Sequence, residues 1–324
     1  MTLTSVPGRN PERWFVFQMR EIVSIGKKTK TALIMEGGAM RGMFTCGVID
    51  VLMESGVTFD AAVGISAGAV FGCNFKSGQI GRPIRYNKAY CRNLRYCSIR
   101  SLLKTGDLYG ADFCYRQLPD VLDPFDREAF SQNPMAFYIG ATDIETGKCA
   151  YHRCTDGDET DMLWLRASAS MPIVSKPVRI EGNSYLDGGI SDAVPYAYME
   201  QLGYARNVIV LTQPKGYRKK PSVGLGLKLF LHQYPGILEA MAHRHEMYNL
   251  QMEEIDRKEA EKTVLVIRPP KALKIGYTEK KPEELERVYQ IGRKEMENRL
   301  PEVCQWLTNQ SVFDLYDIKE KKEC

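Results

Sequence analysis

The chain has 324 residues, of which 44% are apolar and 26% are charged, and it carries a net charge of +4. A chain of this length and composition buries a large core, which excludes disordered and fibrous proteins. The small net charge argues against nucleic acid binding, and only four histidines leave little material for a histidine-rich metal site. We therefore expect no nucleic acid partner, no metal and no cofactor.

Nine cysteines occur without any C-x-x-C pair, which is typical of reduced thiols rather than of a disulfide framework. Arg9, Arg13 and Arg20 interrupt the stretch in which a signal peptide would have its apolar segment. No uninterrupted apolar run approaches the roughly 18 residues that span a bilayer. These features predict a cytoplasmic protein, and peripheral contact with a membrane stays open. They do not indicate an oligomeric state.

Residues 1–30 are polar and irregular, and we interpret them as an N-terminal extension. Order begins with Thr31–Met35, an apolar run of strand length, which is followed by a glycine-rich loop and by helical spacing over Met43–Met53. A second short apolar run, Phe59–Val63, again leads into a glycine turn and a helix. This alternation of strand, turn and helix predicts βαβ units and a parallel sheet.

Further apolar runs of strand length follow, and the chain becomes mainly helical after residue 211. The expected strands cover residues 137–141, 149–153, 176–180, 184–186, 207–211 and 264–267. Residues 71–133 are expected to form helices and loops that cover the sheet. Long helices are expected over 239–262 and from Pro282 onward, because proline is tolerated in a first helical turn.

The segment after the second expected strand fits the G-x-S-x-G pattern of a nucleophile turn: Gly64, Ile65, Ser66, Ala67 and Gly68. A serine on a sharp strand-to-helix turn has a strained backbone, and the helix that follows points its N–H groups toward a reacting carbonyl. The alternative is a tight glycine turn that only packs a helix on a sheet. The strand–turn–helix context favours Ser66 as a nucleophile.

The loop after the first expected strand is also rich in glycine and consists of Gly37, Gly38, Ala39, Met40, Arg41 and Gly42. Exposed N–H groups at a helix start stabilise a pyrophosphate, a nucleotide phosphate or the oxyanion of acyl transfer. No G-K-[ST] follows, which excludes a P-loop, and Ala39 stands where a dinucleotide fingerprint needs glycine. Because the nucleophile turn is the next strand–helix junction, we interpret this loop as an oxyanion hole.

A hydrolytic serine needs a proton acceptor, and histidine is the usual one. The histidines that follow Ser66 are His152, His232, His243 and His245. None of them stands in a glycine-punctuated loop after a strand. Asp187, followed by Gly188 and Gly189, does stand directly after an expected strand, where sites gather in α/β proteins. The alternative for an Asp-Gly pair is a plain turn, but residues 181–183 already supply the local hairpin turn.

These three motifs, in this order, resemble the signatures of the patatin-like phospholipase family, and Ala167–Pro172 is similar to a further segment of that family, S-A-S-x-P. The resemblance covers about residues 31–211, and residues 217–293 resemble the C-terminal half of a bacterial subgroup. It implies a three-layer α/β/α fold with a mostly parallel central sheet. The expected parts are the extension, a patatin-like catalytic domain over 31–215, and a mainly helical region over 216–324 packed on it.

The resemblance also implies a Ser–Asp dyad without histidine, in which Ser66 is the nucleophile and Asp187 the general base. The N–H groups around Gly38, Ala39 and Met40 would form the oxyanion hole. Ala39 replaces a glycine of the family loop, so we expect its φ to stay below zero. A carboxylate with an ordinary pKa of about 4 is a weak base, so either burial raises the pKa of Asp187 or the oxyanion hole carries more of the catalysis.

Three other features admit more than one interpretation. Arg41 occupies a basic position of the family loop, where it either tethers the loop or contacts a phosphate, and we favour tethering. Cys149, His152 and Cys154 suggest a zinc site, but on a strand Cys149 faces away from the other two, so we interpret all three as structural. Residues 215–231, basic and then apolar, suit contact with an anionic membrane, and a core helix behind a solvated loop explains them equally well.

The sequence therefore predicts a serine acyl-hydrolase that acts on lipid or related carboxylic esters. One alternative is a soluble esterase for small acyl esters. A second alternative, from a different class, is a catalytically idle patatin-like scaffold with a regulatory role. The intact serine, aspartate and oxyanion glycines favour an enzyme over the scaffold.

Overall fold

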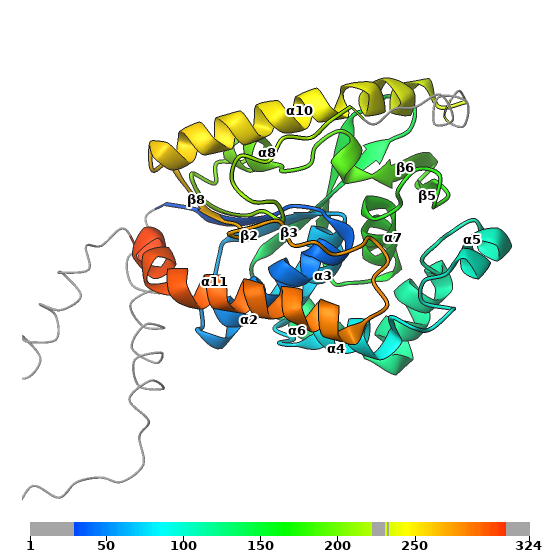
Figure 1. The fold of residues 1–324 in the computed structure, drawn as a ribbon, viewed down its shortest axis with the longest axis horizontal. Coiled ribbons are helices and arrows are strands. Elements are labelled where there is room, and N and C mark those ends of the chain that lie inside the picture. Colours follow the sequence, from blue (N-terminus) through cyan, green and yellow to red (C-terminus); the bar gives the residue numbers. More distant parts are fainter. Residues whose placement is uncertain (1–28, 222–230, 232, 309–324) are drawn as a thin grey trace, which may run out of the picture.

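The computed structural model describes residues 29–221, 231 and 233–308. The expected N-terminal extension lies almost wholly outside these residues, as does most of the apolar run 223–231. The described chain is built around one eight-stranded sheet with helices on both faces (Figure 1). The expected three-layer α/β/α fold is therefore confirmed.

The sheet has the strand order β5-β6-β3-β2-β1-β7-β8, and β4 pairs with β3. Its strands are β1 (Thr31–Met35), β2 (Ala61–Ile65), β3 (Ala136–Asp143), β4 (Cys149–Cys154), β5 (Val178–Ile180), β6 (Asn183–Asp187), β7 (Arg206–Val210) and β8 (Val264–Ile267). All the expected strands are present. Strand β2 both begins and ends later than the expected run Phe59–Val63, so that it includes Gly64 and Ile65.

The centre of the sheet is parallel, from β8 through β7, β1 and β2 to β3. In contrast, β4 and β6 run antiparallel to β3, and β5 runs antiparallel to β6. Every residue of β1, β2 and β8 is buried. Central parallel strands are covered on both faces, which explains why these segments are continuous apolar runs rather than alternating ones.

One face of the sheet is covered by α2 (Gly42–Glu54), α3 (Ala67–Ser77) and α11 (Pro282–Thr308) (Figure 1). The opposite face is covered by α8 (Tyr196–Gln201) and by the long helix α10 (Pro235–Ala260), drawn in yellow in Figure 1. Alternate residues of β1 serve the two layers: Leu33 belongs to the apolar core under α2 and α11, and Ile34 to the core under α10. The C-terminal helices thus complete both outer layers.

The remaining helices lie between β2 and β7 in the chain. They are α4 (Arg82–Tyr90), α5 (Ile99–Thr105), the π-helix η2 (Phe113–Leu122), α6 (Arg127–Gln132) and α7 (Glu159–Ser168). Two short 3-10 helices, η1 (Ala39–Arg41) and η3 (Gly188–Ile190), follow β1 and β6. Among the residues that the structure describes, no helix is long and apolar enough to span a membrane.

Strand β3 aligns the ends of two strands that are far apart in the sequence. Ile65, the last residue of β2, pairs with Gly140, and Asp187, the last residue of β6, pairs with Ala141. Strand β4 pairs with Phe137–Thr142 and so occupies one edge of β3 along nearly its whole length. The residues of β3 that pair with β2 and those that pair with β6 must therefore do so on the opposite edge, where β2 and β6 follow one another. The residue after Ile65 therefore meets the end of β6.

Candidate active site

Ser66 lies at the sharp turn between β2 and α3. Its φ of 54° and ψ of −121° lie in a region that L-residues rarely adopt, so the expected strained turn is confirmed. The glycines on either side leave no space for a side chain. A Cβ at Gly64 would lie 2.4 Å from the carbonyl oxygen of Gly68, and a Cβ at Gly68 would lie 2.3 Å from that of Met35. Only glycine at both positions allows β2, α3 and β1 to approach so closely.

The strained serine is held by a side chain at the end of α7. The N–H of Ser66 donates to Oγ of Ser168 at 2.8 Å, and the Ser168 hydroxyl donates to the carbonyl of Gly140 at 2.6 Å. Ser168 is fully buried. Sequence reasoning noted the segment Ala167–Pro172 only as a family resemblance and did not assign this role. The serines of this segment could have indicated the role, because a buried hydroxyl needs a hydrogen-bond partner.

Asp187 ends β6, and the same segment supports it. Its N–H donates to the carbonyl of Ser170 at 2.8 Å, and its Oδ1 accepts from the N–H of Gly189 at 2.8 Å. Burial raises the pKa of Asp187 above its ordinary value, although the charge of Arg244 and a hydrogen bond from the Ser66 side chain lower it. The structure thus brings Ser66 and Asp187 together and gives the carboxylate a stronger basicity than it has in water.

The glycine-rich loop passes directly over Ser66. A Cβ at Gly37 would lie 2.9 Å from Cβ of Ser66, so the loop and the nucleophile turn are in contact. The expectation that Ala39 keeps a negative φ is wrong, because its φ is 47°. The left-handed conformation costs an alanine only about 1–2 kcal/mol, which the packing of buried Met40 in the helix start can offset. A 3-10 turn begins here, so its first N–H groups are not used by the helix.

Arg41 has contacts that fit the tethering interpretation. Its Nε donates to Oγ1 of Thr212 at 3.4 Å, and its guanidinium lies 5.9 Å from the ring centroid of Tyr277. Thr212 follows β7, and its hydroxyl also lies 3.1 Å from the carbonyl of Gly37. The loop is therefore attached to the end of the neighbouring strand.

A buried carboxylate that sequence reasoning missed lies beneath this loop. Glu36 is 3% exposed, and its Oε2 accepts from the N–H of Thr212 at 2.5 Å. Its Oε1 accepts from the hydroxyl of Tyr248, on α10, at 2.9 Å. A buried carboxylate is tolerated only when such donors surround it. This network joins the glycine-rich loop to the C-terminal region, and no local pattern reveals it because its members come from three distant segments.

None of the described histidines hydrogen-bonds to Ser66 or Asp187. Nε2 of His152 lies 2.6 Å from Oδ1 of Asp161, and its ring stacks on Trp164 with centroids 5.0 Å apart. His243 is exposed and lies 2.8 Å from Oε2 of Glu246, and His245 lies beside the same carboxylate at 3.8 Å. The fourth histidine, His232, lies outside the described residues.

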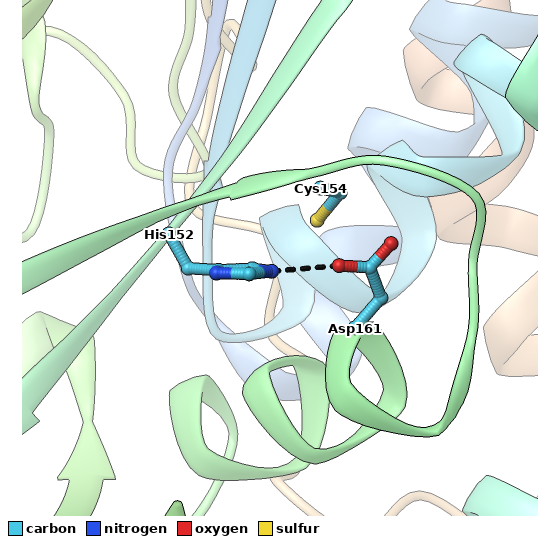
Figure 2. A group of neighbouring side chains, drawn as sticks. All are labelled: His152, Cys154 and Asp161. Atoms are coloured by element: carbon cyan, nitrogen blue, oxygen red, sulfur yellow. Dashed lines mark hydrogen bonds and ion pairs between the residues drawn. The ribbon is translucent and has the colours of Figure 1, made fainter. Parts of the chain in front are cut away.

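His152 and Cys154 form a group with Asp161 of α7, shown in Figure 2. Their ligand atoms lie within 4.8 Å of one another, so this trio has the chemistry of a metal site, whereas Cys149 is not part of it. Both oxygens of Asp161 are already engaged. Oδ1 interacts with His152, and Oδ2 accepts the N–H groups of Thr155 and Gly157 at 3.0 and 2.8 Å. The group ties β4 to the start of α7, in agreement with the structural interpretation.

Comparison with known proteins shows which family the chain is similar to. A family model of the patatin-like phospholipases matches residues 33–199, and a model of a domain of unknown function matches residues 234–308. An uncharacterized protein of Escherichia coli, YjjU, is 26% identical over 279 residues, which are 82% of this chain and 75% of that protein. An uncharacterized NTE family protein of Mycobacterium tuberculosis is 27% identical over 52% of this chain and 45% of its own length.

A lysophospholipase, nte1, of Emericella nidulans is 26% identical over 53% of this chain but only 11% of its own length. The chain thus spans three quarters of the Escherichia coli relative and less than half of the other two. Among solved structures, VipD of Legionella pneumophila has a TM-score of 0.42 and 12% identity over 85% of this chain and 67% of its own. Human GIVD cytosolic phospholipase A2 has a TM-score of 0.48 and 10% identity, with 93% and 64% coverage.

Proposed function

Since the chain belongs to the patatin-like phospholipase family, we propose that it is a serine acyl-hydrolase that cleaves carboxylic esters of lipids with a Ser66–Asp187 dyad. One observation carries the proposal: a strained serine at a helix start lies beside a buried aspartate whose pKa is raised, beneath a glycine-rich loop. Strain, a matched base and free N–H donors are what acyl transfer requires of a site.

The reaction follows from these groups. Asp187 accepts the proton of the Ser66 hydroxyl while Oγ attacks the ester carbonyl carbon. The carbonyl oxygen becomes an oxyanion, and N–H groups at the starts of η1 and α3 stabilise it. The tetrahedral intermediate then expels the alcohol, which takes the proton from Asp187, and leaves an acyl group on Ser66. Water, deprotonated by Asp187, releases the fatty acid and restores the serine.

The raised pKa of Asp187 gives this mechanism a pH dependence. The base works only when it is ionised, so kcat/KM falls as the pH is lowered through the pKa of Asp187. Because burial raises that pKa, we expect the loss to begin at a higher pH than for an exposed aspartate.

Activity toward p-nitrophenyl esters and phospholipids, measured for the wild type and two variants, tests the proposal. Ser66→Ala and Asp187→Asn are each expected to lower kcat by at least about 10³-fold, as is typical of a nucleophile and its base. His243→Gln, an exposed position, is the control and is expected to keep full activity. A fluorophosphonate probe should label the wild type and fail to label Ser66→Ala.

Other outcomes would select the alternatives. Turnover of p-nitrophenyl esters without turnover of any phospholipid would favour a soluble esterase for small esters. A wild-type protein that hydrolyses neither substrate and does not react with the probe would be a catalytically idle scaffold. Retained activity in Ser66→Ala would contradict the dyad itself.

A further inference from the structure

Two basic side chains from outside the patatin-like segment reach the candidate active site, and the mechanism above does not use them. Lys219 lies in the segment after β7, and Arg244 lies on α10. Arg244 also falls within the residues 234–308 that match a domain of unknown function. These two residues therefore indicate how the C-terminal region could contribute to the reaction.

Arg244 lies against the turn that follows Asp187. Its Nε donates to the carbonyl of Gly189 at 2.7 Å. A Cβ built at Gly189 would lie 3.6 Å from Nη2 of Arg244 and 3.1 Å from Oδ1 of Asp187, so the guanidinium and the carboxylate border the same space. Only one of the five N–H donors of this guanidinium is used by the hydrogen bond to Gly189, and the others can serve a ligand.

Lys219 is held in place by Asn249, a residue of the same helix beyond Arg244. Its N–H donates to Oδ1 of Asn249 at 2.8 Å, and its carbonyl accepts from Nδ2 of the same side chain at 3.0 Å. Its ammonium lies 4.2 Å from the ring centroid of Tyr248, the residue that donates to Glu36 beneath the oxyanion loop. Burial and the neighbouring charge of Arg244 lower the pKa of Lys219 to about 8, whereas Glu36 raises it.

The charges of three cations and two carboxylates interact at this site: Arg41, Lys219 and Arg244 against Glu36 and Asp187. Across residues 29–221 and 233–308, none of the three cations lies within ion-pair distance of a carboxylate, so positive charge is in excess. By contrast, nearby Lys215 pairs with Glu259 and Arg218 pairs with Asp256, both on α10. Half-buried cations that repel one another are costly unless an anion binds between them, and such clusters mark binding sites.

We propose that Lys219 and Arg244 form an anion subsite beside Ser66 that binds the phosphate of a phospholipid substrate while its ester faces the nucleophile. This inference rests on the proposed function. A phosphate matches the site because an ammonium and a guanidinium can donate to separate oxygens of the same anion. The C-terminal region would then recognise the head group, and the patatin-like segment would supply the catalysis.

Kinetics with a charged and an uncharged ester test the specificity. The substrates are soluble dihexanoyl phosphatidylglycerol and neutral p-nitrophenyl hexanoate. Lys219→Met is expected to raise KM for the phospholipid about tenfold, the usual effect of losing one charged hydrogen bond, and so to lower its kcat/KM relative to the neutral ester. Lys219→Arg should restore most of this preference. Lys220→Met removes the same charge from the adjacent exposed position and should leave the preference unchanged.

Binding measurements on the Ser66→Ala protein separate this inference from the proposed function, since they need no catalysis. Titration calorimetry with dihexanoyl phosphatidylglycerol and with inorganic phosphate is expected to show about tenfold weaker phospholipid binding when Lys219→Met is added. Equal phospholipid affinity with and without Lys219→Met would overturn the subsite, whether or not the wild type hydrolyses esters. A loss confined to inorganic phosphate would also overturn it, because the site would then serve the free ion. Circular dichroism melts verify that each variant is folded.

Discussion

At the scale of single residues, stability and chemistry conflict at Asp187. The carboxylate is 4% exposed, and burial raises its pKa because the charged form loses its hydration. The folded state therefore binds a proton more tightly than the unfolded state does. It follows that ionised Asp187 destabilises the fold, and that stability falls as the pH rises from the ordinary aspartate range through the raised pKa.

Asp187→Asn should remove this cost along with the activity. We expect the variant to melt at a higher temperature than the wild type at pH 8, by about 2 °C for each kcal/mol gained in a chain of this size. The difference should shrink as the pH is lowered toward 4, because the folded wild-type carboxyl becomes protonated and the cost of burying its charge is lost. Calorimetric melting of both proteins across this pH range is the measurement. A lower melting temperature for Asp187→Asn at pH 8 would show that the charge of Arg244 and the hydrogen bond from Ser66 stabilise the carboxylate by more than burial destabilises it.

Ser168 positions the nucleophile without touching a substrate. Ser168→Ala removes the acceptor of the Ser66 N–H and the donor to Gly140, so we expect kcat to fall about 10- to 100-fold with little change in KM, since small misplacements cost that much. Steady-state kinetics measures this. Ser77→Ala is the matched control, because Ser77 is a buried serine in α3 whose hydroxyl lies 3.3 Å from the carbonyl of Asn74. It should lower stability and leave kcat intact.

At the scale of elements, the crossing of α2 and α11 decides how the C-terminal region is attached. The two helices meet at a pair of glycines. A Cβ at Gly47 of α2 would lie 2.2 Å from the carbonyl oxygen of Tyr289, and a Cβ at Gly292 of α11 would lie 2.0 Å from that of Phe44. Each glycine therefore allows backbone-to-backbone contact that no other residue permits.

Gly292→Ala should force the helices apart and destabilise the protein by about 1–3 kcal/mol, as overpacking does. Urea unfolding followed by circular dichroism is the measurement. Gly276→Ala is the control, because a Cβ at Gly276 meets no atom within 4 Å. Equal stability of Gly292→Ala and the control would mean that α11 shifts without cost.

At the scale of the whole molecule, the C-terminal region completes both the fold and the site. Tyr248, Met252 and Ile255 of α10 are buried in the core that also holds Ile34 of β1. Strand β8 covers the outer edge of β7, which would otherwise offer unpaired backbone groups. The same helix brings Arg244 to the turn after Asp187. Folding and the proposed recognition of the substrate phosphate therefore depend on the same element.

A chain that stops at residue 215 is expected to aggregate or to be degraded, because it would expose the core under α10 and the edge of β7. Expression, solubility and limited proteolysis, compared with a chain that stops at residue 308, measure this. A soluble 1–215 fragment that unfolds cooperatively would contradict the prediction and would show that the α/β part folds alone.

The order of strands and helices and the position of Ser66 could be predicted from the sequence. Central parallel strands are buried on both faces and so appear as short apolar runs, and the glycines around Ser66 mark a turn that tolerates no larger residue. The hairpin turn at residues 181–183 could also be predicted from neighbouring residues alone. Glu181 and Gly182 both have a positive φ there, of 49° and 92°. These features depend on neighbours in the chain, so the amino-acid sequence by itself determined them.

Tertiary structure alone decided which distant groups meet at the site. The shared edge of β3 sets Asp187 beside Ser66, and the end of α7 brings Ser168 to the Ser66 N–H. The positive φ of Ala39 was predicted wrongly, because the strain of one residue is offset by the packing of the loop around it. The approach of Arg244 was not predicted either. Contacts between distant segments depend on pairing register and packing, which no local pattern of residue types specifies.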